Sequence, residues 1–297
     1  MSEASQSATE TAEQRAAHAR ELLSVLTLEP VERNLFLGRN ETRSMPRLFG
    51  GQVLAQALRA ALDTVEAERV PHSLHGYFLR PGNPARPVLY EVDRIRDGGS
   101  FTTRRVVAIQ EGEAILNVDV SLQREEGGME HAMPMPNVPP PDELEDDYVR
   151  ARRLAADHPR LPPLALIPRA FEMRSAIVPW VETPRLFSPT WLRFVGALPA
   201  DDPALPYCLL AYASDMGLMS TSSLPHVAEL PRTALQMASL DHAIWFHRRP
   251  SVADWLLFAK RTTTAVGARG LSHAEFYDRG GELMASVSQE GLLRPRR

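Results

Sequence analysis

Apolar residues in the first part of the chain recur at the spacing of one helical face. After a polar lead to about residue 12, the string "AEQRAAHARELLSVLTLEP" predicts a helix that ends near Pro30. In "LFGGQVLAQALRAALDTV", Val53, Leu54, Ala57 and Leu58 lie on one face of a second predicted helix, which begins at the paired glycines. The other face of this helix is mostly Ala and Gln, so we expect neighbouring elements to enclose it closely.

Four runs with the alternation and β-branched content of strands follow this second helix. The turn strings "RPGNP", "RDGG" and "EGE" separate them, which predicts antiparallel hairpins. One long helix followed by such a meander is typical of an α+β fold in which a sheet covers the helix. The predicted strands cover residues 73–79, 88–95, 100–110 and 114–123.

The same pattern recurs after a proline-rich, acidic stretch that contains "MPMPNVPPPDELEDDY" and has the composition of a linker. Strand-like runs resume, the last of them in "LLAYA", and a short helix is predicted to begin at Asp215. Further strands are predicted in "ALQMASLDHAIWFHR", "WLLFAKRTTT", "ARGLSHAEFY" and "ELMASVSQEG". We therefore expect an internal duplication with four parts: a polar lead and helix start over 1–22, a first domain over 23–124, the linker over 125–163 and a second domain over 164–297.

Residue spacing supports the duplication. Ser73 and Gln123 are 50 positions apart, as are Ser239 and Gln289. In each half the Ser opens the first strand after the helix, in "SLH" or "SLDH", and the Gln closes the last strand, in "VSLQ" or "SVSQ". The two halves are therefore expected to bring a hydroxyl and an amide to matching places.

Only the second half adds an acid to this pattern. Placing the two predicted helix starts in register sets Gln52 against Asp215. At the start of a helix, Asp215 has two interpretations. Its carboxylate could serve only as an N-cap, which contributes about 1 kcal/mol of stability. Alternatively, it could be the acidic residue that takes part directly in the protein's chemistry.

The second interpretation gives a chemistry. A carboxylate at a helix start, with the Ser239 hydroxyl and the Gln289 amide from two strands, can deprotonate a water molecule that the neutral groups hold in line. Backbone N–H groups at the Gly50 and Gly51 start of the first-half helix can stabilise an oxyanion if the halves pack face to face. These parts suit hydrolysis of an activated acyl group such as a thioester, whose leaving thiolate needs little protonation.

Composition narrows the classes of function. A net charge of −4 argues against a general nucleic-acid binder, and no run approaches the ~18 apolar residues that cross a bilayer. The first 26 residues also lack the apolar core of a signal peptide, so we expect a cytoplasmic protein. Cys208 is the sole cysteine and has apolar neighbours, so we expect a buried thiol. His72 and His75 are an odd number of positions apart on one predicted strand and point to opposite faces, so we expect no metal site from them.

Six strings together carry a family resemblance: "LFGGQVLAQAL", "HSLHGYFLRPG", "RDGGSFTTRRVVAIQ", "LLAYASDM", "MASLDHAIWFHR" and "SVSQEGLLR". In this order they resemble the type II acyl-CoA thioesterases, the TesB-like branch of the double hotdog proteins. The resemblance extends from about Leu23 to Arg294 and is weakest over the linker. It implies two hotdog domains fused in one chain, each an antiparallel sheet wrapped around a helix.

The resemblance also implies a function and its residues. It implies hydrolysis of fatty acyl-CoA to a free fatty acid and CoA, with no cofactor. The family's catalytic acid falls on Asp215, its amide on Gln289 and its hydroxyl residue, often Thr, on Ser239. His75 lies in a matching string and is a candidate either for a substrate contact or for a contact to a residue of the site, with Gly51 and Gln52 as candidate oxyanion or substrate-binding residues. A homo-oligomer, dimer or tetramer, is expected.

Three alternatives remain open from the sequence. Asp215 could attack the thioester directly and form an anhydride instead of activating water. A hotdog hydratase or dehydratase is a rival, although "SDMGLMSTSSLPH" lacks the Asn-Pro and the nearby His of its usual stretch. A module that binds acyl-CoA without turnover, in which Asp215 is only a cap, is the third. Arg80, Arg104 and Arg105 are candidates by type for the phosphates of CoA.

Overall fold

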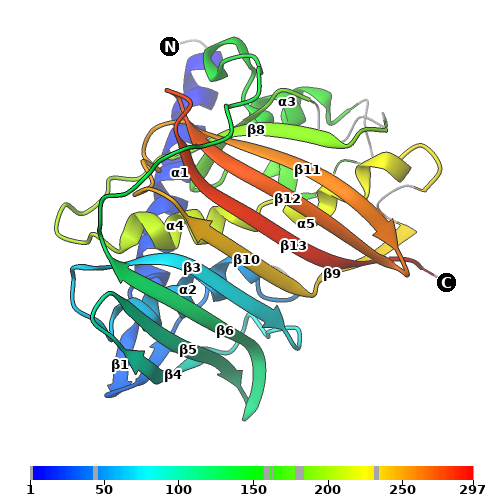
Figure 1. The fold of residues 1–297 in the computed structure, drawn as a ribbon. Helices are drawn as coiled ribbons and strands as arrows, with labels where there is room; N and C mark the ends of the chain where they lie inside the picture. The colour runs from blue at the N-terminus through cyan, green and yellow to red at the C-terminus, as the bar shows by residue number, and fades with distance from the viewer. Residues whose placement is uncertain are drawn as a thin grey trace.

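The structure is a computed structural model, and Figure 1 shows two curved sheets around paired helices. No helix in the described part of the chain is long and apolar enough to cross a membrane. The described residues are 3–42, 46–156, 161, 163–177, 184–230 and 234–296.

The first half forms a sheet around one helix, as the alternation pattern predicts. The long helix α2 is amphipathic and follows two short strands, and the four-strand meander comes after it. In the sheet these strands lie in the order β1-β2-β4-β5-β6-β3, all antiparallel. The elements are α1 (Glu3–Val25), β1 (Glu29–Glu32), β2 (Leu35–Gly38), α2 (Gly50–Leu62), β3 (Arg69–Phe78), β4 (Val88–Asp97), β5 (Phe101–Gln110) and β6 (Glu113–Arg124).

The second half repeats this plan around a second helix, α4. Its strands lie in the order β10-β13-β12-β11-β8-β7, and β9 also pairs with β13. The elements are β7 (Phe171–Ser175), β8 (Phe187–Phe194), α4 (Leu205–Ser214), α5 (Leu218–Thr221), the 3₁₀ turn η3 (Leu224–His226), β9 (Leu235–Ser239), β10 (Asp241–Phe246), β11 (Leu256–Val266), β12 (Arg269–Asp278) and β13 (Leu283–Pro295).

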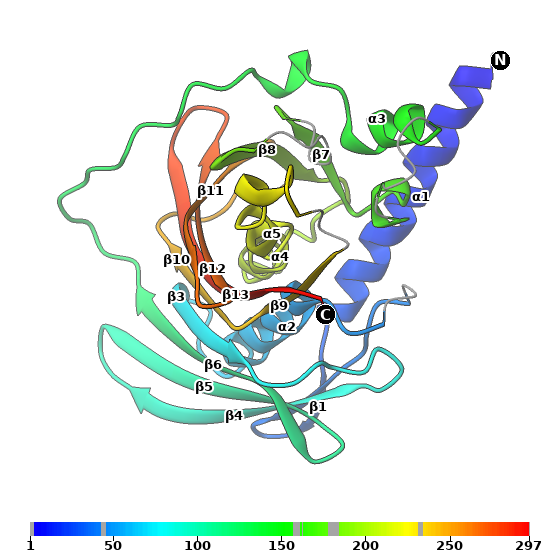
Figure 2. The same cartoon turned by 90° about the vertical axis from the view of Figure 1, so that its right-hand side faces the viewer.

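The two sheets join edge to edge through β3 and β10. These strands pair antiparallel from Ser73 opposite Trp245 to Tyr77 opposite Asp241. The strand order is therefore the same when read outward from this seam in either direction, which confirms the predicted double hotdog. Figure 2 shows each sheet curved around its own helix, with α2 inside the first sheet and α4 inside the second.

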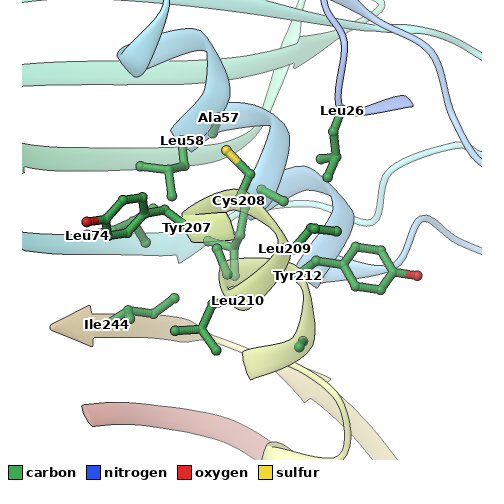
Figure 3. Packing of buried hydrophobic residues seen from close by; sticks show 14 of the residues in the cluster. Leu26, Ala57, Leu58, Leu74, Tyr207, Cys208, Leu209, Leu210, Tyr212 and Ile244 are labelled. Atoms are coloured by element: carbon green, nitrogen blue, oxygen red, sulfur yellow. The ribbon is translucent and has the colours of Figure 1, made fainter. Parts of the chain in front are cut away.

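The main core lies between α2 and α4. Figure 3 shows Cys208 on α4 directed at the α2 helix near Ala57, and Leu210 directed at Ile244 on β10. Cys208 has no exposed surface, as expected, and burial raises the pKa of its thiol far above the ordinary value. The small residues of α2 allow this close approach, because large side chains would hold the helices apart.

Three local expectations were wrong or incomplete. Residues 209–213, expected as a strand, belong to helix α4, and the short helix expected to begin at Asp215 begins at Leu218 instead. Helix α1 begins at Glu3, within the stretch expected as a polar lead. The proline-rich stretch contains the 3₁₀ turn η1 (Pro141–Glu143) and a helix, α3 (Asp147–Leu154), which the composition did not predict.

Candidate active site

Asp215 caps a helix, but not the expected one. It is the C-terminal cap of α4, and its carboxylate points across the core to the first turn of α2 in the other half. There Oδ2 accepts a 2.9 Å hydrogen bond from the backbone N–H of Gly51. The cap residue of α2, Phe49, makes no side-chain hydrogen bond of its own, so Asp215 supplies the missing acceptor. The register of Gln52 with Asp215 as two helix starts is therefore wrong.

The two neutral partners lie beside the acid. Gln289 on β13 donates through Nε2 to Oδ1 of Asp215 at 2.7 Å and to Oγ of Ser239 at 3.1 Å. Ser239 is the last residue of β9 and comes within reach because β9 pairs with β13. Since Ser239 accepts from Gln289, and since no described residue accepts its own proton, that O–H is free to hold a small molecule.

Burial sets the acidity of this carboxyl group. Removal from water raises the pKa of Asp215 from 3.8 to about 6, against the lowering effect of the hydrogen bonds from Gln289 and Gly51 and of the more distant positive charge of Arg47. The carboxylate nevertheless opens onto a cavity, so water can reach it. An acid with a pKa near 6 is mostly ionised at neutral pH and is still basic enough to take a proton from water.

The cavity has a volume of about 830 Å³ and is formed by both halves. The catalytic candidates Asp215 and Ser239 line it, with the N-terminal turn of α2 on one side and α5 on the other. Part of its wall is apolar and comes from both halves. This apolar wall includes Leu48, Phe78, Leu79, Pro81, Ile115, Leu116, Met216, Met219 and Leu240.

The polar groups of Gly51 and Gln52 are taken up by hydrogen bonds within the protein, although Gln52 borders the cavity. The N–H of Gly51 is occupied by Asp215. The side-chain amide of Gln52 accepts from the N–H of Glu41 and donates to Asn40 and Gln56. The expectation that Gly51 donates to an oxyanion is therefore corrected. In the described part of the chain the N–H of Gly50, which also borders the cavity, has no acceptor.

His75 lies outside the site. It is exposed on β3 between the buried residues Leu74 and Gly76, so its side chain projects outward from the outer face of the sheet. Its ring packs edge-on against Trp245, with ring centroids 4.8 Å apart. Adjacent residues on a strand point to opposite faces, and Leu74 points to the inner face of the sheet. His75 therefore points outward, and the expectation of a substrate contact is wrong.

The candidate arginines separate by burial. Arg104 is 1% exposed and donates to Thr64 and Asp97, so it is part of the fold. Arg105 pairs with Asp119 on the exposed surface, whereas Arg80 borders the cavity. Sequence reasoning missed Arg47, which also borders the cavity and donates to the carbonyl of Met237. Among the described residues no cluster of three or more metal-ligating side chains occurs.

Comparison with known proteins agrees with this architecture. The family described as "Acyl-CoA thioesterase N-terminal domain" matches residues 41–123, and the family described as "Acyl-CoA thioesterase" matches residues 185–292. Acyl-CoA thioesterase 2 of Haemophilus influenzae is 35% identical over 92% of this chain and 96% of the relative. Acyl-coenzyme A thioesterase 8 of Homo sapiens is 36% identical over 91% of this chain and 88% of the relative.

Solved structures extend the likeness to three dimensions. The chain is similar to the acyl-CoA thioesterase II TesB2 of Mycobacterium marinum, with a TM-score of 0.77 and 38% identity over 92% of this chain and 98% of that one. The TesB protein of Mycobacterium avium subspecies paratuberculosis gives a TM-score of 0.78 at 31% identity, covering 93% and 100% of the two chains. With both halves matched, in sequence and in fold, this chain belongs to the type II acyl-CoA thioesterases, hydrolases of acyl-CoA thioesters.

Proposed function

We propose that Asp215 is the general base of this thioesterase. Its support is the hydrogen-bonded set of Asp215, Gln289 and Ser239 at the cavity wall, which presents an ionised carboxylate beside a free hydroxyl. A water molecule held between Asp215 and Ser239 gives its proton to the carboxylate and attacks the thioester carbonyl carbon. Gln289 keeps both groups in place through one amide nitrogen.

The remaining steps need no second acid. The negative charge on the carbonyl oxygen is stabilised by the free N–H of Gly50, at the positive end of the α2 dipole. When the carbon–sulfur bond breaks, CoA leaves as a thiolate, and protonated Asp215 returns the proton to sulfur. A thiolate is a good enough leaving group for this sequence, because alkyl thiols such as that of cysteine are fairly acidic, with a pKa of about 8.5.

We further propose that a fatty acyl chain occupies the apolar wall and that Arg47 and Arg80 meet the phosphates of CoA at the cavity mouth. Support for the first point is the run of Leu, Ile, Met and Phe side chains along that wall. The proposal also includes domain bounds of 23–124 and 164–297, a homo-oligomer and a cytoplasmic location. Light scattering of the purified chain measures the oligomer.

Substitution of the acid tests the mechanism. We expect Asp215→Asn to lower the rate of CoA release from octanoyl-CoA roughly 10²- to 10⁴-fold, because Asn cannot accept the proton. The matched control is Asp63→Asn, since Asp63 is the C-terminal cap of α2 and pairs with Arg59 at the end of that helix away from the cavity. A similar loss in both variants, or none in Asp215→Asn, contradicts the proposal.

A single-turnover reaction in ¹⁸O-labelled water separates general-base catalysis from an anhydride route. With Asp215 as general base, the label enters the fatty acid in the first turnover and stays out of the protein. Label recovered in the peptide that carries Asp215 would show that the carboxylate itself attacked the thioester.

A further inference from the structure

Lys260 is a buried cation in the wall of the same cavity. It lies on β11 two residues after Phe258, and Phe258 belongs to the main core, so both side chains point to the inner face of the sheet. Lys260 is 5% exposed and borders the cavity. Neither the water-activating residues nor the apolar wall explains why an ammonium group is placed there.

A chain of hydrogen bonds fixes the direction in which Lys260 donates. Its Nζ donates to Oγ1 of Thr190 at 2.9 Å, and the hydroxyls of Thr190 and Ser175 are 3.0 Å apart. Ser175 gives its proton to Oδ2 of Asp147 at 2.6 Å, so Thr190 must donate to Ser175 and accept from Lys260. Two of the three N–H bonds of the ammonium group therefore remain without an acceptor among the described residues.

The charges of this cluster do not cancel. Asp147 is the carboxylate at the end of the chain, but Arg150 pairs with it directly. No described carboxylate lies in ion-pair distance of Lys260. Its Nζ lies 4.7 Å from the centroid of the Phe258 ring, a cation–π contact that does not neutralise the charge. The cluster thus carries one surplus positive charge at the cavity wall.

A buried cation without an anion beside it is costly, and burial lowers the pKa of Lys260 to about 8, against the raising effect of the Asp147 carboxylate. At neutral pH the ammonium form still predominates. An apolar residue would avoid this cost, and an anion that arrives to pair with the charge would offset it. The cavity is the side from which such an anion can come.

We propose that Lys260 binds an acidic group at the far end of the acyl chain, so that the enzyme accepts acyl-CoA substrates that carry a terminal carboxylate. This deepens the proposed function, on which it rests. Lys260 pairs with Ala274, and Ala274 with Val287, two residues before Gln289. Strand spacing and rise then place the Cα atoms of Lys260 and Gln289 roughly 12 Å apart, a span that suits an acyl chain of medium length.

The acyl end is favoured over the phosphates of CoA by the surroundings of Lys260. The phosphates are strongly hydrated, whereas Lys260 lies against Phe258 and is almost closed to solvent. A carboxylate at the end of an apolar chain can reach such a site with the chain along the apolar wall, and it fills the two free N–H bonds with charge-assisted hydrogen bonds.

The test compares two substrates of equal length, suberoyl-CoA and octanoyl-CoA, which differ in the terminal carboxylate. In Lys260→Met we expect the kcat/KM for suberoyl-CoA, relative to that for octanoyl-CoA, to fall roughly 10- to 100-fold from the wild-type ratio. The control is Arg261→Met, because Arg261 is the next residue on β11 and pairs with Glu275 on the outer face. This control should keep the wild-type ratio.

The ratio decides the outcome. If both substrates lose equally in Lys260→Met, the lysine contacts the CoA part and the proposal is wrong. If neither changes, Lys260 only holds Thr190 and the proposal is also wrong. Octanoyl-CoA turnover by the wild type and by Asp215→Asn reports separately on the catalytic mechanism, so failure of one proposal is distinguishable from failure of the other.

Discussion

Asp63 and Asp215 show how neighbours, rather than residue type, decide what a carboxylate does. Asp63 and Asp215 each end a core helix. Asp63 forms an ion pair with Arg59, which also pairs with Asp202. Asp215 meets only neutral donors, Gly51 and Gln289, at a cavity wall. Those donors keep the carboxylate ionised and ordered without cancelling its charge, and this leaves it able to accept a proton.

The pH dependence of the rate follows from this environment. The proposed base must be ionised, so we expect kcat/KM to fall about tenfold per pH unit below the pKa of Asp215, about 6, and to be flat above it. In Gln289→Leu the midpoint should move to higher pH, because the lost hydrogen bond had lowered this pKa. Ser239→Ala should lower the plateau without moving the midpoint. A wild-type midpoint near 4 would contradict this account.

At the scale of residues, the sequence predicted the trio but not its surroundings. Asp215, Ser239 and Gln289 were expected together from their spacing and from the family resemblance. The structure places Asp215 and Ser239 within hydrogen-bond range of Gln289. The outward direction of His75 follows from the period of two along a strand, a signal that was present in the sequence. Lys260 carried no such signal, because its burial depends on pairing with strands distant in the chain.

At the scale of elements, the site depends on how closely α2 approaches the end of α4. A Cβ atom at position 51 would lie 2.4 Å from the backbone carbonyl oxygen of Tyr212. A Cβ at position 50 would lie 2.9 Å from Oδ2 of Asp215. The paired glycines are therefore required by packing, and they bring the N–H of Gly51 to the acid.

Gly51→Ala tests this contact. We expect the added methyl to push α2 away from α4 at a cost of about 1–3 kcal/mol and to break the hydrogen bond to Asp215, so that melting temperature and kcat both fall. Differential scanning calorimetry and CoA release measure the two effects. Gly99→Ala is the control, because a Cβ at position 99 meets nothing within 4 Å. Unchanged kcat in Gly51→Ala would show that this hydrogen bond is dispensable.

The elements differed in how well the pattern predicted them. The four strands after α2 and the last three strands of the second half were found within a few residues, because alternation and turn residues mark them. Helix α4 was mistaken for a strand in part, because all of its residues are buried and no polar face interrupts the apolar run. A short apolar run carries no period that separates a buried helix from a strand.

At the scale of the whole molecule, duplication of one unit produced a single composite site. The acid, amide and hydroxyl come from the second half, and the capping N–H of Gly51 comes from the first. The duplication was visible in the sequence as a repeated order of elements. The seam between β3 and β10 was not, since edge-to-edge pairing depends on backbone groups that every strand edge offers.

A split protein tests whether both halves are needed. The cut lies between Gly127 and Gly128, which are exposed and precede the part of the linker that packs on the second sheet through Met135 and Val138. We expect residues 128–297 alone to be inactive, because the β10 edge and the buried face of α4 lose their cover. Co-expression with residues 1–127 should restore octanoyl-CoA hydrolysis and give a complex that copurifies, since the β3–β10 pairing and the helix contact need no covalent link. Full activity of the second half alone would mean that the first half contributes nothing to the chemistry.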